Sequence, residues 1–307
     1  MRGPAARADG FAERLASRAR PGLFSRRSTR SIVERTVVYL LTAVLGAMFL
    51  GPFLFAVSGS LMQPSELYLI PPKWVPSRLL WENYARVWTM VPFPRYILNT
   101  LIVTAFAMVG QLGSSSLVAY GFARFRFPGR HLLFIVLLGT MIMPGEVTTI
   151  PQFLLFKALG WIDTFLPLIV PSYLGVSAFT IFLLRQFFLT LPRDLDDAAT
   201  IDGAGTLRVL LQILVPLSKP ALATVAILAF IHHWNDFFHP LIYLNSKELY
   251  TVSLGLNYFR SAPTEAGPPM AHLLMAAAII VTLPVIAVFF SLQRYFVQGI
   301  VMSGIKG

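Results

Sequence analysis

The segment DLDDAATIDGAGTLRVLLQILVPLSKPAL, residues 194–222, is a polar interruption in an otherwise apolar chain. Its first nine positions hold four of the 14 acidic residues of the chain. Glycines and prolines follow, at Gly203, Gly205, Pro216 and Pro220. Charged side chains are costly inside a bilayer, so we expect this segment to lie outside the membrane.

The composition around this segment is that of a membrane protein. Of the 307 residues, 56% are hydrophobic and 13% are charged, whereas a soluble domain carries about 25% charged residues. The chain has no cysteine, which excludes disulfides, thiolate metal sites and cysteine nucleophiles. A large soluble enzyme is therefore a poor interpretation.

Six segments are long and apolar enough to cross a bilayer, which takes about 20 residues of helix. The first has an apolar core too long for a signal peptide and is interpreted as a retained helix. The sequence predicts an all-α integral membrane protein with six transmembrane helices. Residues 1–36 form a basic tail, and residues 37–307 form the transmembrane domain. The six segments are roughly 37–57, 97–120, 132–152, 165–188, 217–244 and 272–296.

The basic residues are distributed unevenly between the two sides of these spans. Eighteen of the 25 Lys and Arg residues fall in the tail, in the loop 121–131, in the stretch from Arg185 to Lys219 and at the C-terminus. The positive-inside rule then places both termini and the 189–216 loop in the cytoplasm. The net charge of +11 is thus a topology signal, with the tail against anionic lipid, and no nucleic-acid partner is expected.

The acidic part of the 189–216 loop has the pattern of a short helix over residues 194–204. Asp194 suits the N-cap, and acids in the first turn favour the helix dipole. Ala198 and Ala199 give a small apolar face that another surface can approach closely. Gly203 is suited to a left-handed position that ends the helix. A second amphipathic helix is predicted from the leucines at 207, 210, 211 and 214, before Pro216 redirects the chain.

These residues resemble the "EAA" loop of the membrane-spanning subunits of bacterial ABC importers. The motif here is Asp197-Ala198-Ala199-x-x-Asp202-Gly203-Ala204, followed by Ile213-x-x-Pro216-x-x-x-Pro220. Asp197 stands where the family usually has Glu, and Val215 where Leu usually precedes the proline. The resemblance implies a coupling helix between spans 4 and 5 that docks on a cytoplasmic ATPase. The residues implied in this coupling are Asp197, Ala198, Ala199, Asp202, Gly203, Ala204 and Pro216.

The resemblance extends over nearly the whole chain. The segments NYARVW (83–88), AYGFARFRFPGR (119–130) and WNDFFHPL (234–241) are similar to the carbohydrate-uptake branch, in particular to its smaller, maltose-permease-type subunit. This implies a type I ABC importer permease fold in the inner or plasma membrane of a bacterium or archaeon. It also implies a second homologous permease subunit, two ATPase subunits and an extracytoplasmic solute-binding protein, which the outer segment 245–271 is expected to contact.

No cofactor and no catalysis are expected in this chain. It has no Gly-x-x-x-x-Gly-Lys-Ser/Thr loop, so ATP and Mg are expected on the separate ATPase. The candidates for the substrate path are Glu146, Asn235 and Asp236, because polar groups within spans are often functional. Asn99 and Gln111 are interpreted as interhelical hydrogen-bond partners, and Gly110, Gly113 and Gly121 as sites of close helix packing.

Three alternatives remain at this level. The first is an ABC importer permease for a solute other than a sugar. The second is a passive or secondary transporter. The third is an intramembrane enzyme that uses His232 and Asp236, which are four residues apart on a helix. With His233 and His239 nearby, a metal site also deserves a test, but three or four converging ligands are not evident, so none is predicted.

Overall fold

The computed structural model describes residues 23–175, 177–261 and 270–304, and over these ranges the regular elements are all helical. Side chains of residues 23–33, 261 and 294–304 are not described. The chain divides into two units, residues 1–56 and 57–307. Most of the predicted basic tail and the Gly267-Pro268-Pro269 turn of the outer segment lie outside the described residues.

The first unit is described by one helix, α2 (Leu23–Ser60), whose last residues belong to the second unit. Its portion Glu34–Ser60 is long and apolar enough to cross a membrane. Pro52 lies inside the helix, which a membrane helix tolerates where other groups satisfy the freed carbonyl. This portion contains the predicted span 37–57.

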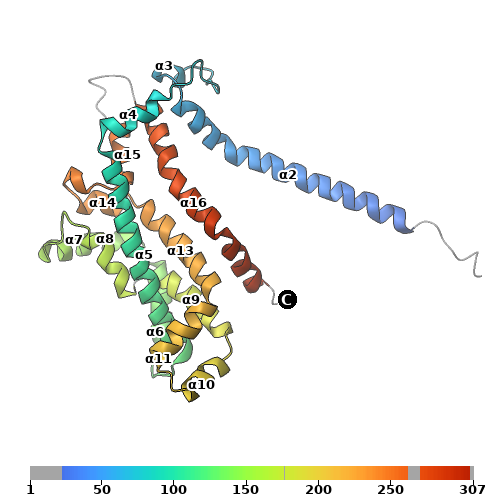
Figure 1. Ribbon diagram of the computed structural model, residues 1–307, viewed down its shortest axis with the longest axis vertical. Helices are drawn as coiled ribbons and strands as arrows, with labels where there is room; N and C mark the ends of the chain where they lie inside the picture. Colours follow the sequence, from blue (N-terminus) through green and yellow to red (C-terminus); the bar gives the residue numbers. More distant parts are fainter. Residues whose placement is uncertain (1–22, 176, 262–269, 305–307) are drawn as a thin grey trace, which may run out of the picture. The chain divides into compact units, whose positions relative to one another are not determined.

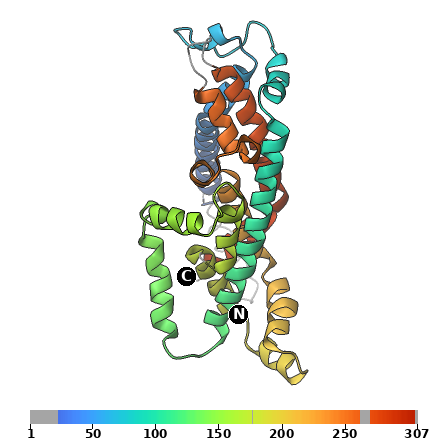
Figure 2. The ribbon, with the colours of Figure 1, turned by 90° about the vertical axis from the view of Figure 1, so that its left-hand side faces the viewer.

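The second unit is built around α5 (Phe93–Arg124), which packs against α9 (Ala178–Thr190) and α13 (Lys219–Trp234). Helix α16 (Ala271–Gly304) packs on the other side of α13. Within this unit, α3 (Pro64–Leu67), α4 (Glu82–Met90) and α15 (Val252–Ser261) lie at one end (Figure 1). Helices α10 (Asp194–Ile201) and α11 (Thr206–Val209) lie at the opposite end (Figures 1 and 2).

Two apolar segments of the second unit are bent rather than straight; one bend lies within the predicted span 132–152, and the other lies at the start of the predicted span 217–244. The segment Arg130–Ile142 meets Gly145–Ala158 at 98°, and Thr206–Leu217 meets Lys219–Trp234 at 84°. The first break falls at Met143-Pro144, where Met143 is extended, as the residue before a proline usually is. Four helices are thus long and apolar enough to span, or six with each bent pair counted once, and each predicted span overlaps one of them.

The remaining elements of the second unit are short helices and helical turns. The first pair consists of α6 (Arg130–Gly139), η2 (Thr140–Ile142), η3 (Gly145–Thr148) and α7 (Thr149–Ala158). Helix α8 (Leu166–Ile169) and η4 (Val170–Leu174) precede α9. A π-helical turn, η5 (Leu210–Leu214), and α12 (Val215–Leu217) precede α13. The predicted fifth span continues after α13 as a separate helix, α14 (Phe238–Tyr243), followed by η6 (Lys247–Leu249).

The loop 58–96 is held together by polar contacts that are buried or partly buried. The side-chain amide of Asn83 donates to the carbonyl oxygens of Ser60 and Met62, at 2.9 and 3.1 Å. Lys73 Nζ lies 2.6 Å from Glu66 Oε1. Hydrogen bonds from Lys73 and Ser77 lower the pKa of Glu66 to about 2. The loop is therefore an ordered cap on this end of the unit.

The predicted roles of the small and amide residues of α5 are confirmed in part. Asn99 donates its side-chain amide to the backbone oxygens of Glu248 and Tyr250, at 2.8 and 3.0 Å. At Gly110 an added Cβ would lie 2.4 Å from the ring of Tyr173, so the close approach needs glycine there. At Gly113 and Gly121 an added Cβ meets nothing within 4 Å among the described residues.

Candidate functional site

Helix α10 ends in a glycine corner at the predicted position. Gly203 has a φ of 81°, in the left-handed region that favours glycine. Its N–H donates to the carbonyl of Thr200 at 3.0 Å, and the N–H of Ala204 donates to the carbonyl of Ala199 at 2.9 Å. These two bonds satisfy the last carbonyls of the helix in the Schellman arrangement. The predicted glycine stop is confirmed, and the helix proper ends at Ile201.

The start and the apolar face of α10 differ from the sequence-based prediction. Arg193 occupies the N-cap position, and Asp194 is the first helical residue. Ala199 is buried within its own chain, whereas Asp197, Ala198 and Asp202 are exposed. Because α10 is wrapped by its own neighbours on one side, the two alanines do not share an exposed face.

A large apolar side chain missed by the sequence analysis stands at the tip of α10. Ile201 is 87% exposed. Leu207 and Leu211 of the following turns are also exposed, while Leu210 and Leu214 are buried in a core cluster with residues of α5 and α9. The predicted leucine face is thus split between this chain's core and a free surface. Pro216 lies in α12, immediately before the bend into α13.

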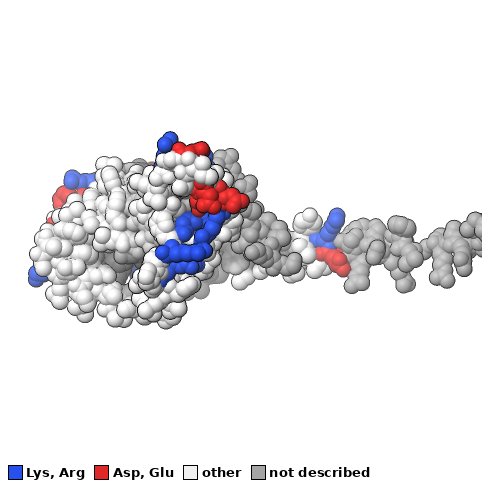
Figure 3. Space-filling model, turned by 90° about the horizontal axis from the view of Figure 1, so that it is seen from below, with Lys and Arg blue, Asp and Glu red and all other residues white. Residues whose placement is uncertain are grey.

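An ion pair fastens α10 to the end of α5. Arg124 Nε lies 2.7 Å from Asp196 Oδ2, and the side chains are 5% and 19% exposed. Arg124 also donates to the carbonyl oxygen of Leu191, at 3.2 Å. Burial raises the pKa of Asp196, and the Arg124 charge opposes that shift. In Figure 3 this end of the molecule shows acidic side chains next to basic ones.

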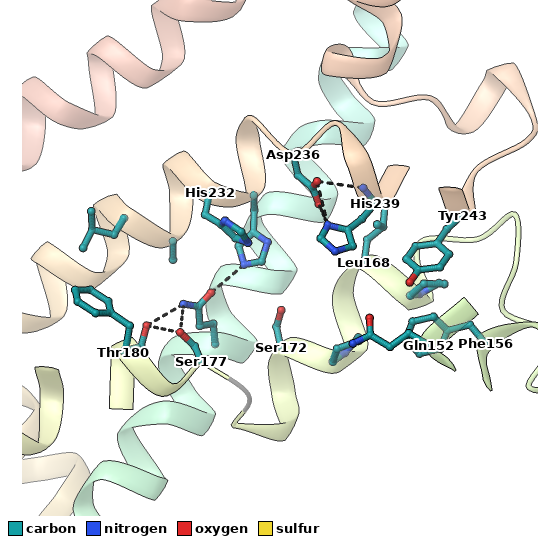
Figure 4. Close-up of a pocket in the computed structure, with 17 residues that line it drawn as sticks. Gln152, Phe156, Leu168, Ser172, Ser177, Thr180, His232, Asp236, His239 and Tyr243 are labelled. Atoms are coloured by element: carbon teal, nitrogen blue, oxygen red, sulfur yellow. Dashed lines mark hydrogen bonds and ion pairs between the residues drawn. The ribbon is translucent and has the colours of Figure 1, made fainter. Parts of the chain in front are cut away.

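The second site is a cavity of about 530 Å³ in the second unit. Its lining comes from α5, α7, α8, η4, α9, α13 and α14. Two gaps between helices contribute to the lining, with Ser177 between η4 and α9 and Asp236 between α13 and α14. Figure 4 shows His232, Asp236 and His239 along one wall, with Ser172, Ser177 and Thr180 along another. Breaks in spanning helices bring polar groups to the interior that a straight apolar helix does not present.

One wall of the cavity is a fixed polar network. Gln111 donates its amide N–H groups to the hydroxyls of Ser177 and Thr180, at 3.1 and 2.9 Å. Its carbonyl oxygen lies 3.0 Å from His233 Nε2. The predicted role of Gln111 as an interhelical partner is confirmed, because it joins α5 to α9 and α13. The sequence did not indicate that the same residue lines a cavity.

Of the three predicted substrate-path residues, the structure brings only Asp236 to the cavity. Its carboxylate lies 2.9 and 3.1 Å from His239 Nδ1. Asn235 is exposed and caps its own helix through the Ile231 carbonyl, at 2.9 Å. Glu146 lies exposed in η3. Neither is among the lining residues.

No metal site forms at the histidines in the described ranges, where no group of three or more His, Cys, Asp or Glu residues converges. His232 and His233 are in ring contact, with centroids 5.1 Å apart. One of the lining residues has a buried, unsatisfied hydroxyl. Tyr243 is 1% exposed, and its Oη has no hydrogen-bond partner among the described residues.

Comparisons with known proteins agree with one another. The family model described as "Binding-protein-dependent transport system inner membrane component" matches residues 111–302. The arabinooligosaccharides transport system permease protein AraQ of Bacillus subtilis (strain 168) is 33% identical over 289 residues, which are 92% of this chain and 99% of AraQ. The sn-glycerol-3-phosphate transport system permease protein UgpE of Yersinia enterocolitica is 33% identical, over 87% of this chain and 95% of UgpE.

A solved structure supports the same fold. A chain of a bacterial ABC transporter involved in the import of the acidic polysaccharide alginate superposes with a TM-score of 0.75 at 25% identity. The match covers 91% of this chain and all of that chain. The fold of the described helices is therefore that of a transporter's membrane subunit.

Proposed function

The chain belongs to the family of binding-protein-dependent transport system inner membrane components, and from this membership we propose that it forms half of the translocation path of an ATP-driven sugar importer. It is a transport subunit of the cell membrane rather than an enzyme. The named relatives serve arabinooligosaccharides and sn-glycerol-3-phosphate, and the similar structure serves alginate. These solutes support a sugar or sugar-related substrate. They include both neutral and acidic compounds, so they do not indicate whether the substrate is charged.

We propose that α10 is the coupling helix. The position of α10 and the residues exposed on its surface support this proposal. It stands at one end of the second unit (Figures 1 and 2), in a loop predicted to be cytoplasmic, and it presents Ile201 almost fully exposed. In the proposed assembly the ATPase would remove this apolar side chain from water, which is favourable, beside the exposed carboxylates of Asp197 and Asp202. Asp197, Ala198, Asp202 and Gly203 lie on the same exposed segment and complete the proposed ATPase contact.

The remaining predicted coupling residues, Ala199, Ala204 and Pro216, would support the coupling helix rather than contact the ATPase. Ala199 supports the helix from inside, and the N–H of Ala204 closes the corner. Pro216 lies before the bend of 84° that leads into α13. A push on α10 would therefore reach α5 through Arg124 and α13 through this bend. Two ATPases, a second permease chain and an external binding protein complete the proposed assembly.

Co-purification tests the coupling helix. The whole chain is expressed with its ATPase and permease partners, and Ile201→Asp is compared with Leu79→Asp. Leu79 is also exposed, but it lies in the loop at the opposite end. We expect Ile201→Asp to lose the ATPase while the permease pair stays intact, and Leu79→Asp to keep it. Equal ATPase retention in the two variants, with coupled sugar uptake in both, would refute the proposed docking role.

Cysteine labelling tests the proposed orientation, and the absence of native cysteine gives a clean background. Ser77→Cys is expected to react with an impermeant thiol reagent in intact cells. Thr206→Cys is expected to react only after the membrane is opened. Labelling of Thr206→Cys in intact cells would place α10 outside and overturn the orientation.

A further inference from the structure

The described residues that line this cavity include no fixed positive side chain, because none of them is a lysine or an arginine. The charged pair in the wall is Asp236 with His239. If His239 is protonated the pair is neutral, and if it is not the pair carries one negative charge. In neither state does the pair add a net positive charge to the wall.

An anionic solute would lose its water in this cavity without gaining a cation. Phosphates and carboxylates are held in proteins by arginine or lysine, because a charge-assisted hydrogen bond offsets the loss of hydration. Burying a charge without such a partner is strongly unfavourable. The nearby N-terminus of α9, which begins at Ala178, supplies only about half a positive charge.

The same cavity suits groups that both donate and accept hydrogen bonds. Tyr243 Oη is buried and unpartnered among the described residues. His232 projects from the opposite wall (Figure 4), where its ring contacts that of His233. Phe156 and Phe179 add apolar faces to the lining. Apolar walls with a few convergent polar groups are the usual make-up of a small-molecule site, and a sugar presents both C–H faces and hydroxyls.

We infer that this cavity is a selective contact site for uncharged sugar units, in which Asp236 and the lack of any fixed cation reject acidic sugars. The inference rests on the proposed function, because it takes the cavity as part of the translocation path. It assigns specificity to this chain itself, through Asp236, His232 and Tyr243. It excludes phosphorylated sugars and uronates from the solutes that pass this wall.

The charge preference of the cavity is measured directly with single cysteines in the assembled transporter. His232→Cys and Gln152→Cys place a thiol in opposite parts of the lining. Each is treated at pH 8 with two methanethiosulfonate reagents of similar size, one with a trimethylammonium group and one with a sulfonate. Rates are normalised to those with 2-mercaptoethanol. We expect the anionic reagent to react at least about tenfold more slowly than the cationic one, and Asp236→Asn to bring the ratio toward one.

A second arm uses sugars as probes. An uncharged trisaccharide is expected to slow the labelling of both cysteines, whereas a uronic acid trisaccharide of the same length is not. A normalised rate ratio of one or below at both cysteines, or equal protection by both trisaccharides, would overturn the inference. The proposed function fails separately, if the complex with its binding protein and ATP imports no sugar of either kind. The reagent ratio does not depend on that outcome.

Discussion

Arg124, the last residue of α5, forms an ion pair of 2.7 Å with Asp196 in the first turn of α10. The pair is largely buried, and Arg124 also holds the carbonyl of Leu191 at the end of the preceding segment. Helix α5 in turn packs on α9 and α13 and contributes Gln111 to the cavity. The pair is therefore the direct side-chain link between the proposed ATPase contact and the helices around the proposed sugar path.

Breaking the pair is expected to cost more than removing both partners. Arg124→Met leaves Asp196 buried without its counter-charge, at roughly 3 kcal/mol of unfolding free energy. Asp196→Leu likewise leaves the buried charge of Arg124 without its counter-charge. The double variant removes both charges and should recover much of the lost unfolding free energy. If apolar packing between α5 and α10 is enough to transmit the motion, it should also recover ATPase coupling. Thermal unfolding and coupled ATPase activity measure the cycle.

The exposed Arg126→Met is the matched control for loss of a positive charge in the same loop. It should leave both readouts unchanged. Additive effects of Arg124→Met and Asp196→Leu would show that the two residues act independently.

The glycine corner predicts a contrast between two nearby glycines. Gly203→Ala forces a side chain into a left-handed conformation, at about 1 kcal/mol, although space for the Cβ is open. Gly205 has an ordinary φ of −70° and equally open space. We therefore expect Gly203→Ala to weaken ATPase retention and Gly205→Ala to have no effect. Gly203→Asn should keep much of the wild-type ATPase retention, because asparagine tolerates the left-handed conformation. The same loss at both positions would mean that bulk, not backbone conformation, matters.

Close packing of α5 against η4 predicts a second contrast. In Gly110→Ala the new Cβ would lie 2.4 Å from Tyr173, whereas in Gly113→Ala it meets nothing within 4 Å. Overpacking of this kind typically costs about 1–3 kcal/mol. Thermal unfolding in detergent should show a loss for Gly110→Ala, which Tyr173→Ala relieves in the double variant, and little change for Gly113→Ala. Equal midpoints for the two single variants would contradict the close approach.

The loop around Glu66 is expected to loosen in acid. Since its pKa is lowered to about 2 in the folded loop, from about 4.3 in an unfolded chain, the ionised form stabilises the fold. That stabilisation is complete above about pH 4.3 and is lost as the pH falls through about 2. Hydrogen exchange of residues 63–78, corrected for the intrinsic rate, should lose protection over this window.

In Glu66→Gln this protection should be low already at pH 5 and should change little with acid. Glu82→Gln, at an exposed carboxylate of the same region, is expected to keep the wild-type profile. A wild-type profile in Glu66→Gln would show that the pair with Lys73 does not hold the loop.

Features set by neighbouring residues were predictable from the sequence. Helix α10, its acidic first turn and the left-handed Gly203 follow from local hydrogen-bonding and backbone sterics. The approximate positions of the spans follow from long apolar runs, because a bilayer requires a long apolar helix surface, whereas the bends of 98° and 84° do not follow from them. The family resemblance added the expected role, and family membership is now shown.

Features that join distant segments were decided only by the tertiary structure. No local pattern states that Arg124 meets Asp196, that Ala199 is covered while Ile201 is free, or that Gln111 and Asp236 line one cavity. Glu146 and Asn235 carry the same polar signal in the sequence as Asp236, yet only Asp236 reaches the cavity. A polar side chain in a span shows that some partner is needed, whereas the breaks and packing of the helices determine which partner it meets.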